Sequence, residues 1–147
     1  MLKKYFAVAF ALAAVLLLSS CQSAAPKAAE DSFLVSVTND SDVPWKGLHF
    51  EYYLDREPIG GAAVEAYSQP EFAVGESLTK DFIPRDFPEN AELSGFGLEV
   101  FVMHADGTET LAEPVVELKA EYGVEYDYRI QGNEKEGFTI SPIKKAG

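Results

Sequence analysis

The sequence predicts an all-β fold, a sandwich of about seven or eight antiparallel strands that follows a cleaved signal helix. Two observations predict it. Apolar and polar residues alternate along several segments, which is the period of a strand with one buried face. Turn-forming residues separate these segments at intervals of roughly ten residues, as they do in β-sandwiches.

The amino-terminal segment has the layout of an export signal. Lys3 and Lys4 precede a run from Tyr5 to Leu18 that contains no charged residue and no proline, as in secretory signal peptides. A helix of roughly 14 residues is about 21 Å long, well short of the ~30 Å hydrocarbon core of a bilayer. A cleaved signal over residues 1–20 is therefore favoured over a transmembrane span.

The only cysteine, Cys21, directly follows Leu18, Ser19 and Ser20. This tetrapeptide resembles the lipobox of bacterial lipoproteins. The resemblance implies that Cys21 carries a diacylglyceryl group and further acyl chains such as palmitate, and that it becomes the first residue of the mature protein. Because each buried methylene contributes about 0.8 kcal/mol, two or three chains hold a protein firmly on a membrane. A thiol used for lipid is lost to disulfides, metal sites and catalysis.

The expected location is therefore extracytoplasmic, with the protein lipid-anchored to a bacterial cell membrane. In a Gram-negative host the resemblance implies the outer membrane, because Gln22 rather than aspartate follows the cysteine. Residues 21–31 are expected to form a lipidated flexible tether, since the stretch from Gln22 to Asp31 has no bulky apolar residue. Ten flexible residues have a root-mean-square reach of about 17 Å.

Residues 32–147 are expected to form one β-sandwich domain, a common domain size. Without Lys3 and Lys4, ten basic residues stand against 24 acidic ones, so the mature charge is 10 − 24 = −14. Nucleic acids and anionic headgroups are bound by basic patches. We therefore expect no nucleic-acid partner, and contact with the membrane through the lipid anchor.

The individual strands are identified by their alternation. They are expected over residues 33–38, 47–55, 59–67, 76–83, 94–104, 115–119, 122–131 and 137–141. In the three clearest segments, the side chains expected to face the core are Leu48, Phe50, Tyr52 and Leu54; Phe96, Leu98, Val100 and Val102; and Val124, Tyr126, Tyr128 and Ile130.

Turn chemistry predicts how these strands connect. The Asp106-Gly107 pair suits a tight hairpin, and Gly132 begins another reversal. A looser turn is expected over residues 55–58, and a bulge or bend at Gly60 and Gly61. One helical turn is expected within residues 85–93.

The segment LKAEYGVEYDYRIQ, residues 118–131, resembles the region of immunoglobulin-like and fibronectin type III domains that leads into strand F. The resemblance implies an immunoglobulin-like sandwich. It also implies a core leucine at Leu118, a turn glycine at Gly123, and a corner tyrosine at Tyr126 whose hydroxyl bonds back to nearby backbone.

Few residues carry the marks of catalysis. His49 and His104 are the only histidines and lie 55 positions apart, outside any ligand-spaced pair. No nucleophile elbow is present. We therefore expect no catalytic residue, no metal, no cofactor and no enzyme activity. In the loop Thr38–Asp42, the oxygen-rich side chains fit either a solvated turn or a calcium site.

Aromatic residues offer a candidate ligand platform. Trp45, Tyr53 and Tyr67 could stack against a sugar or a peptide, although Trp45 could instead fill the end of the sandwich core. The predicted function is a non-catalytic binding or structural module of the cell envelope, with an envelope protein or a glycan as partner. The alternative is a lipoprotein that binds a glycan or small ligand through these surface aromatics, and a small hydrolase is the third hypothesis.

Overall fold

The computed structural model describes residues 26–65 and 71–144, so the signal peptide, Cys21 and Tyr67 lie outside the described residues. Within these ranges the chain forms eight strands and two single-turn 3-10 helices, which confirms the all-β prediction. The elements are β1 (Phe33–Asn39), β2 (Gly47–Leu54), β3 (Glu57–Glu65), β4 (Ser77–Phe82), η1 (Pro84–Asp86), η2 (Leu93–Gly95), β5 (Phe96–Met103), β6 (Glu109–Leu118), β7 (Glu125–Asn133) and β8 (Gly137–Pro142).

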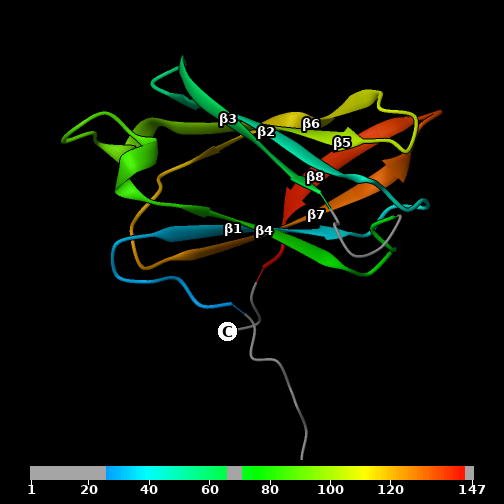
Figure 1. Ribbon diagram of the computed structural model, residues 1–147, viewed down its shortest axis with the longest axis horizontal. Helices are drawn as coiled ribbons and strands as arrows, with labels where there is room; N and C mark the ends of the chain where they lie inside the picture. The colour runs from blue at the N-terminus through cyan, green and yellow to red at the C-terminus, as the bar shows by residue number, and fades with distance from the viewer. Residues whose placement is uncertain (1–25, 66–70, 145–147) are drawn as a thin grey trace, which may run out of the picture.

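Side by side in the hydrogen-bonded sheet, the strands lie in the order β3-β2-β5-β6-β8-β7-β1-β4. The first four form one layer and the last four form the other. Figure 1 shows β3, β2, β5 and β6 in the upper layer, and β1 and β4 in the lower layer. Only two residue pairs join β6 to β8, so the sheet folds over at this point and closes into a sandwich.

Two of the seven strand pairings within the described residues are parallel, whereas the sequence predicts antiparallel neighbours throughout. β7 runs parallel to β1, and β8 runs parallel to β6. These strands are not joined by a hairpin, and only a tight hairpin forces its two strands to be antiparallel. The other five pairings are antiparallel.

The predicted alternation decides which side chains face the core. On β2 and β5 the predicted inward set is buried, apart from the half-buried Leu54 at the end of β2. Tyr128 and Ile130 on β7 are buried as well, whereas Val124 and Tyr126 nearer its start are half-buried. Phe101 and Met103 are half-buried on the outer face of β5.

One end of the core is a cluster of aromatic rings centred on Phe33. Its ring stacks on Phe82 with centroids 4.9 Å apart and meets Phe96 edge-on at 5.3 Å. Phe82 also contacts Phe96 and Tyr52, each with centroids 5.2 Å apart. Such pairs stabilise a fold by about 0.5–1.5 kcal/mol each beyond the burial of their area. The cluster fixes the end of the sandwich at which β5 begins.

The predicted corner tyrosine is confirmed. The Tyr126 hydroxyl donates to the Lys119 carbonyl oxygen and accepts from the Glu121 amide, with both distances 3.0 Å. Gly123 has a φ of +81°, as expected of a turn glycine. Leu118 is half-buried against the core. The hydroxyl therefore ties the connection between β6 and β7 to the start of β7.

Two segments differ from the predicted boundaries. β6 begins at Glu109, although only residues 115–119 were expected, because Pro114 and the surrounding glutamates interrupt the apolar pattern. Opposite this interruption the register of β5 and β6 shifts between Leu98 and Val100. The β2–β3 turn is tighter than expected, with Leu54 paired directly to Glu57.

Both ends of the described chain meet at β7. The Ala28 amide donates to Glu125 Oε1 at 3.1 Å, and the Ile143 amide donates to the Asp127 carbonyl oxygen at 2.7 Å. Figure 1 shows both ends leaving on the side of the lower layer. The chain therefore enters and leaves the domain on the layer that does not contain β2 and β5.

Across residues 26–65 and 71–144, no helix has the length and hydropathy needed to cross a bilayer.

Candidate functional site

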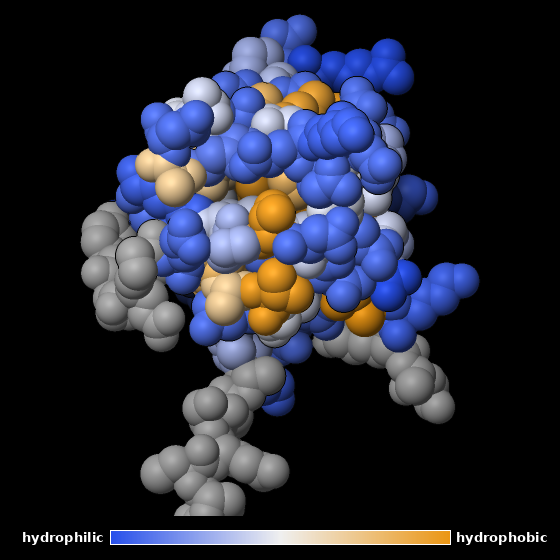
Figure 2. All heavy atoms as spheres, turned by 90° about the vertical axis from the view of Figure 1, so that its right-hand side faces the viewer, coloured by the Kyte–Doolittle hydropathy of each residue, from blue (hydrophilic) through white to orange (hydrophobic). Residues whose placement is uncertain are grey.

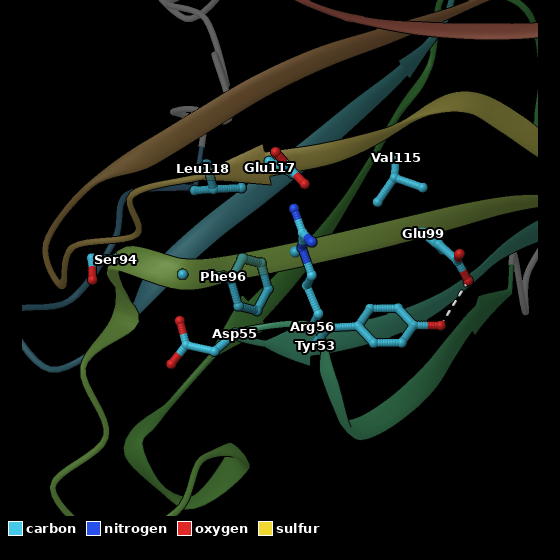
Figure 3. A pocket seen from close by; sticks show the side chains of 11 residues that line it. Tyr53, Asp55, Arg56, Ser94, Phe96, Glu99, Val115, Glu117 and Leu118 are labelled. Atoms are coloured by element: carbon cyan, nitrogen blue, oxygen red, sulfur yellow. Dashed lines mark hydrogen bonds between the residues drawn. The ribbon is translucent and has the colours of Figure 1, made fainter.

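A hollow of about 620 Å³ lies on the outer face of the upper layer, where β2, β5 and β6 run side by side. Its centre is a row of three residues in register, Tyr53 on β2, Gly97 on β5 and Glu117 on β6. The β2–β3 turn forms one rim, and Val115 and Glu117 form the opposite one (Figure 3). Its volume lies within the range of small-molecule sites, about 300–1,000 Å³.

Gly97 forms the floor of the hollow. A Cβ at this position would lie 3.7 Å from Tyr53 Cβ and 3.9 Å from the Val116 carbonyl oxygen, which are ordinary contact distances. Its φ is not in the left-handed region. Neither the backbone nor the neighbouring atoms require glycine here, so the missing side chain leaves room for a Cβ above the strand, although Gly97 itself is buried.

Gly95, two residues earlier, is different. A Cβ there would lie 2.0 Å from Asp55 Oδ1. The Asp55 amide also donates to the Gly95 carbonyl oxygen at 2.9 Å. Gly95 therefore lets the β2–β3 turn pack closely against the start of β5, and this contact fixes the rim of the hollow.

The rim carries Asp55 and Arg56 in an unusual backbone conformation. Their φ angles are +52° and +70°, and a two-residue type I′ hairpin turn requires such positive values at both central positions. Figure 3 shows the Arg56 side chain extending across the hollow toward Glu117. Within the described residues the guanidinium forms no ion pair or hydrogen bond.

The Tyr53 hydroxyl lies between two carboxylates on neighbouring strands. It is 2.8 Å from Glu99 Oε2 and 3.2 Å from Glu51 Oε2, and these glutamates face each other in register. The hydrogen bond to Glu99, then desolvation and the nearby negative charges, raise the pKa of Tyr53 to about 12. The hydroxyl therefore remains a donor at neutral pH and holds the ring beside the hollow.

The predicted aromatic platform is wrong for Trp45. Its side chain is 0% exposed, packs against Phe72 and Phe138, and donates from Nε1 to Ser41 Oγ at 3.1 Å. An apolar ring with a satisfied N–H is stable in the core, and it cannot meet a ligand from solution. Tyr67 lies outside the described residues, so Tyr53 is the one predicted platform residue that the structure places beside the hollow.

The two histidines lie apart, each with its own partners. His49 stacks on Phe101 and has Nδ1 3.0 Å from Glu109 Oε2. His104 is buried, with Nδ1 3.2 Å from Glu134 Oε1 and Nε2 2.8 Å from Thr110 Oγ1. In the part of the chain that the structure describes, no group of three His, Cys, Asp or Glu side chains is arranged to hold a metal ion.

The acidic loop Thr38–Asp42 uses its oxygens internally. Asp40 Oδ2 accepts from Gln131 Nε2 at 2.8 Å, and Asn39 Oδ1 accepts from Ser41 Oγ at 2.6 Å. The Asn39 amide group donates to the Val43 and Phe72 carbonyl oxygens. These contacts favour the interpretation of a hydrogen-bonded turn that supports the loop beside Trp45.

Sequence patterns did not single out Gly97 or Arg56. A glycine inside a strand pattern is a signal of close approach by a ligand or another chain, and Gly97 carries that signal. Arg56 gave no signal, because its place on the hollow depends on the tight β2–β3 turn.

No family model and no curated protein matches this chain. Among solved structures, it is similar to an NMR structure of a protein from Eubacterium rectale, with 9% identity, a TM-score of 0.46, and coverage of 79% of this chain and 92% of that one. It is also similar to intermedilysin in a structure with human CD59, with 7% identity, a TM-score of 0.39 and coverage of 78% of this chain and 24% of that one. A third similar structure is the membrane-binding domain of pneumolysin, with 8% identity, a TM-score of 0.33 and coverage of 79% of this chain and 97% of that one.

Proposed function

We propose that the protein is a lipid-anchored, non-catalytic binding or structural module on the extracytoplasmic side of a bacterial membrane. The observation that carries this proposal is the sequence Leu18-Ser19-Ser20-Cys21 at the end of an uncharged apolar run. Its resemblance to a lipobox implies acylation of Cys21. In a Gram-negative host the anchor would lie in the outer membrane.

The arrangement of the domain supports this proposal. The segment before β1, residues 26–32, is bonded through the Ala28 amide to Glu125 on β7, whereas the hollow lies on the opposite layer. Figure 2 shows that hydrophilic residues cover most of the end of the sandwich away from the β2–β3 turn, around a group of hydrophobic residues near its centre. A domain tethered from the β7 side would turn its hollow away from the lipid surface, where envelope proteins and glycans are accessible.

The test is a Cys21→Ser variant of the full chain, expressed in a bacterium with lipoprotein processing. We expect the variant to remain unprocessed and to lack the mass of acyl chains. The matched control is Ser20→Ala, which keeps a small residue before the cysteine and should mature normally. Membrane retention and normal processing of Cys21→Ser would contradict the proposal.

A second candidate function is the binding of a glycan or small ligand at the hollow. The observation that favours it is the position of Tyr53, whose ring borders an open space of about 620 Å³ and whose hydroxyl is fixed by Glu99. Aromatic rings and a few placed polar groups are typical of ligand sites. The titration in the next subsection tests this function.

A further inference from the structure

Gly97 and Arg56 border the same hollow, and both are unfavourable choices for the stability of the fold. Glycine inside a strand makes a protein less stable than alanine does, because glycine has more conformational freedom to lose when the chain folds. The space above Gly97 accepts a Cβ without any contact closer than 3.7 Å. Alanine would therefore fit at this position and stabilise the strand.

Arg56 is unfavourable because it has a side chain at a position where glycine is favoured. Its φ of +70° is in the left-handed region, where glycine is favoured and a long side chain costs roughly 1–2 kcal/mol. The guanidinium has no ion pair or hydrogen bond within the described residues to offset that cost. Strained residues of this kind gather at functional sites.

The chemistry of the hollow indicates what that ligand is. The Tyr53 ring and Val115, which is 41% exposed, offer apolar surface on the strands to either side of the buried Gly97. Arg56 supplies hydrogen-bond donors, while Asp55, Glu99 and Glu117 supply acceptors. Three carboxylates against one guanidinium give the rim a net charge of −2, which repels an anion. A pyranose ring has an apolar C–H face and hydroxyl groups that both donate and accept.

We propose that the hollow binds an uncharged saccharide, with one sugar ring lying over Gly97 beside Tyr53 and its hydroxyls bonded to Arg56 and Glu117. This inference rests on the second candidate function above and names its ligand class. Gly97 provides the room for the ring, and Arg56 provides the donors.

The experiment is a titration of the protein as the bacterium processes it, held in a detergent that has no sugar headgroup and followed by amide NMR. The uncharged probes are cellobiose, maltose and lactose. The charged probes resemble cellobiose: chitobiose carries amino groups, and cellobiouronic acid carries a carboxylate. We expect an uncharged probe to shift the amides of Gly97 and its neighbours and to bind at least tenfold more tightly than cellobiouronic acid.

Two variants test the role of the residues. Gly97→Ala and Arg56→Gly should each weaken binding tenfold or more and yet raise the Tm. The control is Ala63→Ser, at an exposed position on β3, which should change neither the binding nor the Tm. A residue with a structural role alone would lower the Tm when replaced, so this combination distinguishes a ligand site from a packing site.

The inference is overturned if no uncharged probe shifts these amides, if only a charged probe binds, or if both variants bind as the unchanged chain does. A lower Tm in both variants would also overturn it. If no saccharide binds but membrane retention still requires Cys21, this inference is wrong and the proposed lipid anchor is unaffected. If a saccharide binds but membrane retention does not require Cys21, the proposed anchor is wrong and the saccharide site is unaffected.

Discussion

Replacing Tyr126 with phenylalanine removes one oxygen atom and keeps the ring, so it isolates the hydrogen bonds of the corner. The hydroxyl makes two of them, with the Lys119 carbonyl oxygen and the Glu121 amide, both at 3.0 Å. A neutral hydrogen bond contributes about 0.5–1.5 kcal/mol to stability. Lys119 and Glu121 are exposed, so water can replace the lost partner, and we expect a total loss of about 1–1.5 kcal/mol.

Thermal and urea unfolding followed by circular dichroism measure this loss. For a domain of this size, 1 kcal/mol corresponds to a fall in Tm of roughly 3–6 °C. The control is Tyr122→Phe, since Tyr122 is 38% exposed and its hydroxyl has no hydrogen bond within the described residues. That variant should change stability by less than about 0.5 kcal/mol. An unchanged Tm in Tyr126→Phe, or equal losses in the two variants, would refute the corner assignment.

Two further predictions concern the hollow and the hairpin that joins β7 to β8. The pKa of Tyr53, about 12 in the folded state, exceeds the 10.0 of a free tyrosine, so its contribution to stability is complete below pH 10 and is lost as the pH rises through 12. Glu99→Gln should lower this pKa, measured by tyrosinate absorbance, and an unchanged titration would contradict the assigned hydrogen bond. Gly132→Ala places a Cβ 2.2 Å from the Gly137 carbonyl oxygen at a φ of +110°, and should cost about 3 kcal/mol or more in urea unfolding. Gly123→Ala, at +81° in open space, should cost only about 1–2 kcal/mol, and equal losses would show that the close contact does not matter.

The features that the sequence predicted correctly are local ones. Alternation identified β2, β5 and β7 with their buried faces, because the period of two is imposed by the strand itself. Tyr126 was assigned a bond to backbone only a few residues away, and that bond is present. The parallel pairing of β1 with β7 joins Leu34 to Glu125, a contact between distant segments that no local pattern encodes.

The candidate site was predicted only in part, and the reason is physical. Tyr53, Gly97 and Glu117 come from three strands, and strand register alone brings them into one row. Trp45 was a candidate for the ligand platform and also for the end of the core, because aromatic residues suit both cores and binding faces. In the core its indole N–H donates to the Ser41 hydroxyl oxygen, and a sequence does not reveal whether such a partner is present.

The segment before β1 and the hollow lie on separate layers of the sandwich, and this separation bears on both proposals. Sheets in a sandwich lie about 10 Å apart, so a tether that reaches the β7 layer through Ala28 would leave the whole core between the lipid and Gly97. A ligand above Gly97 would then lie beyond the headgroups even if the lower layer rested on them. The net charge of the chain, −12, repels anionic lipids and acts in the same direction. If the protein is anchored through Cys21, the hollow would be distant from the membrane and accessible to an extended polymer, which suits a glycan better than a lipid.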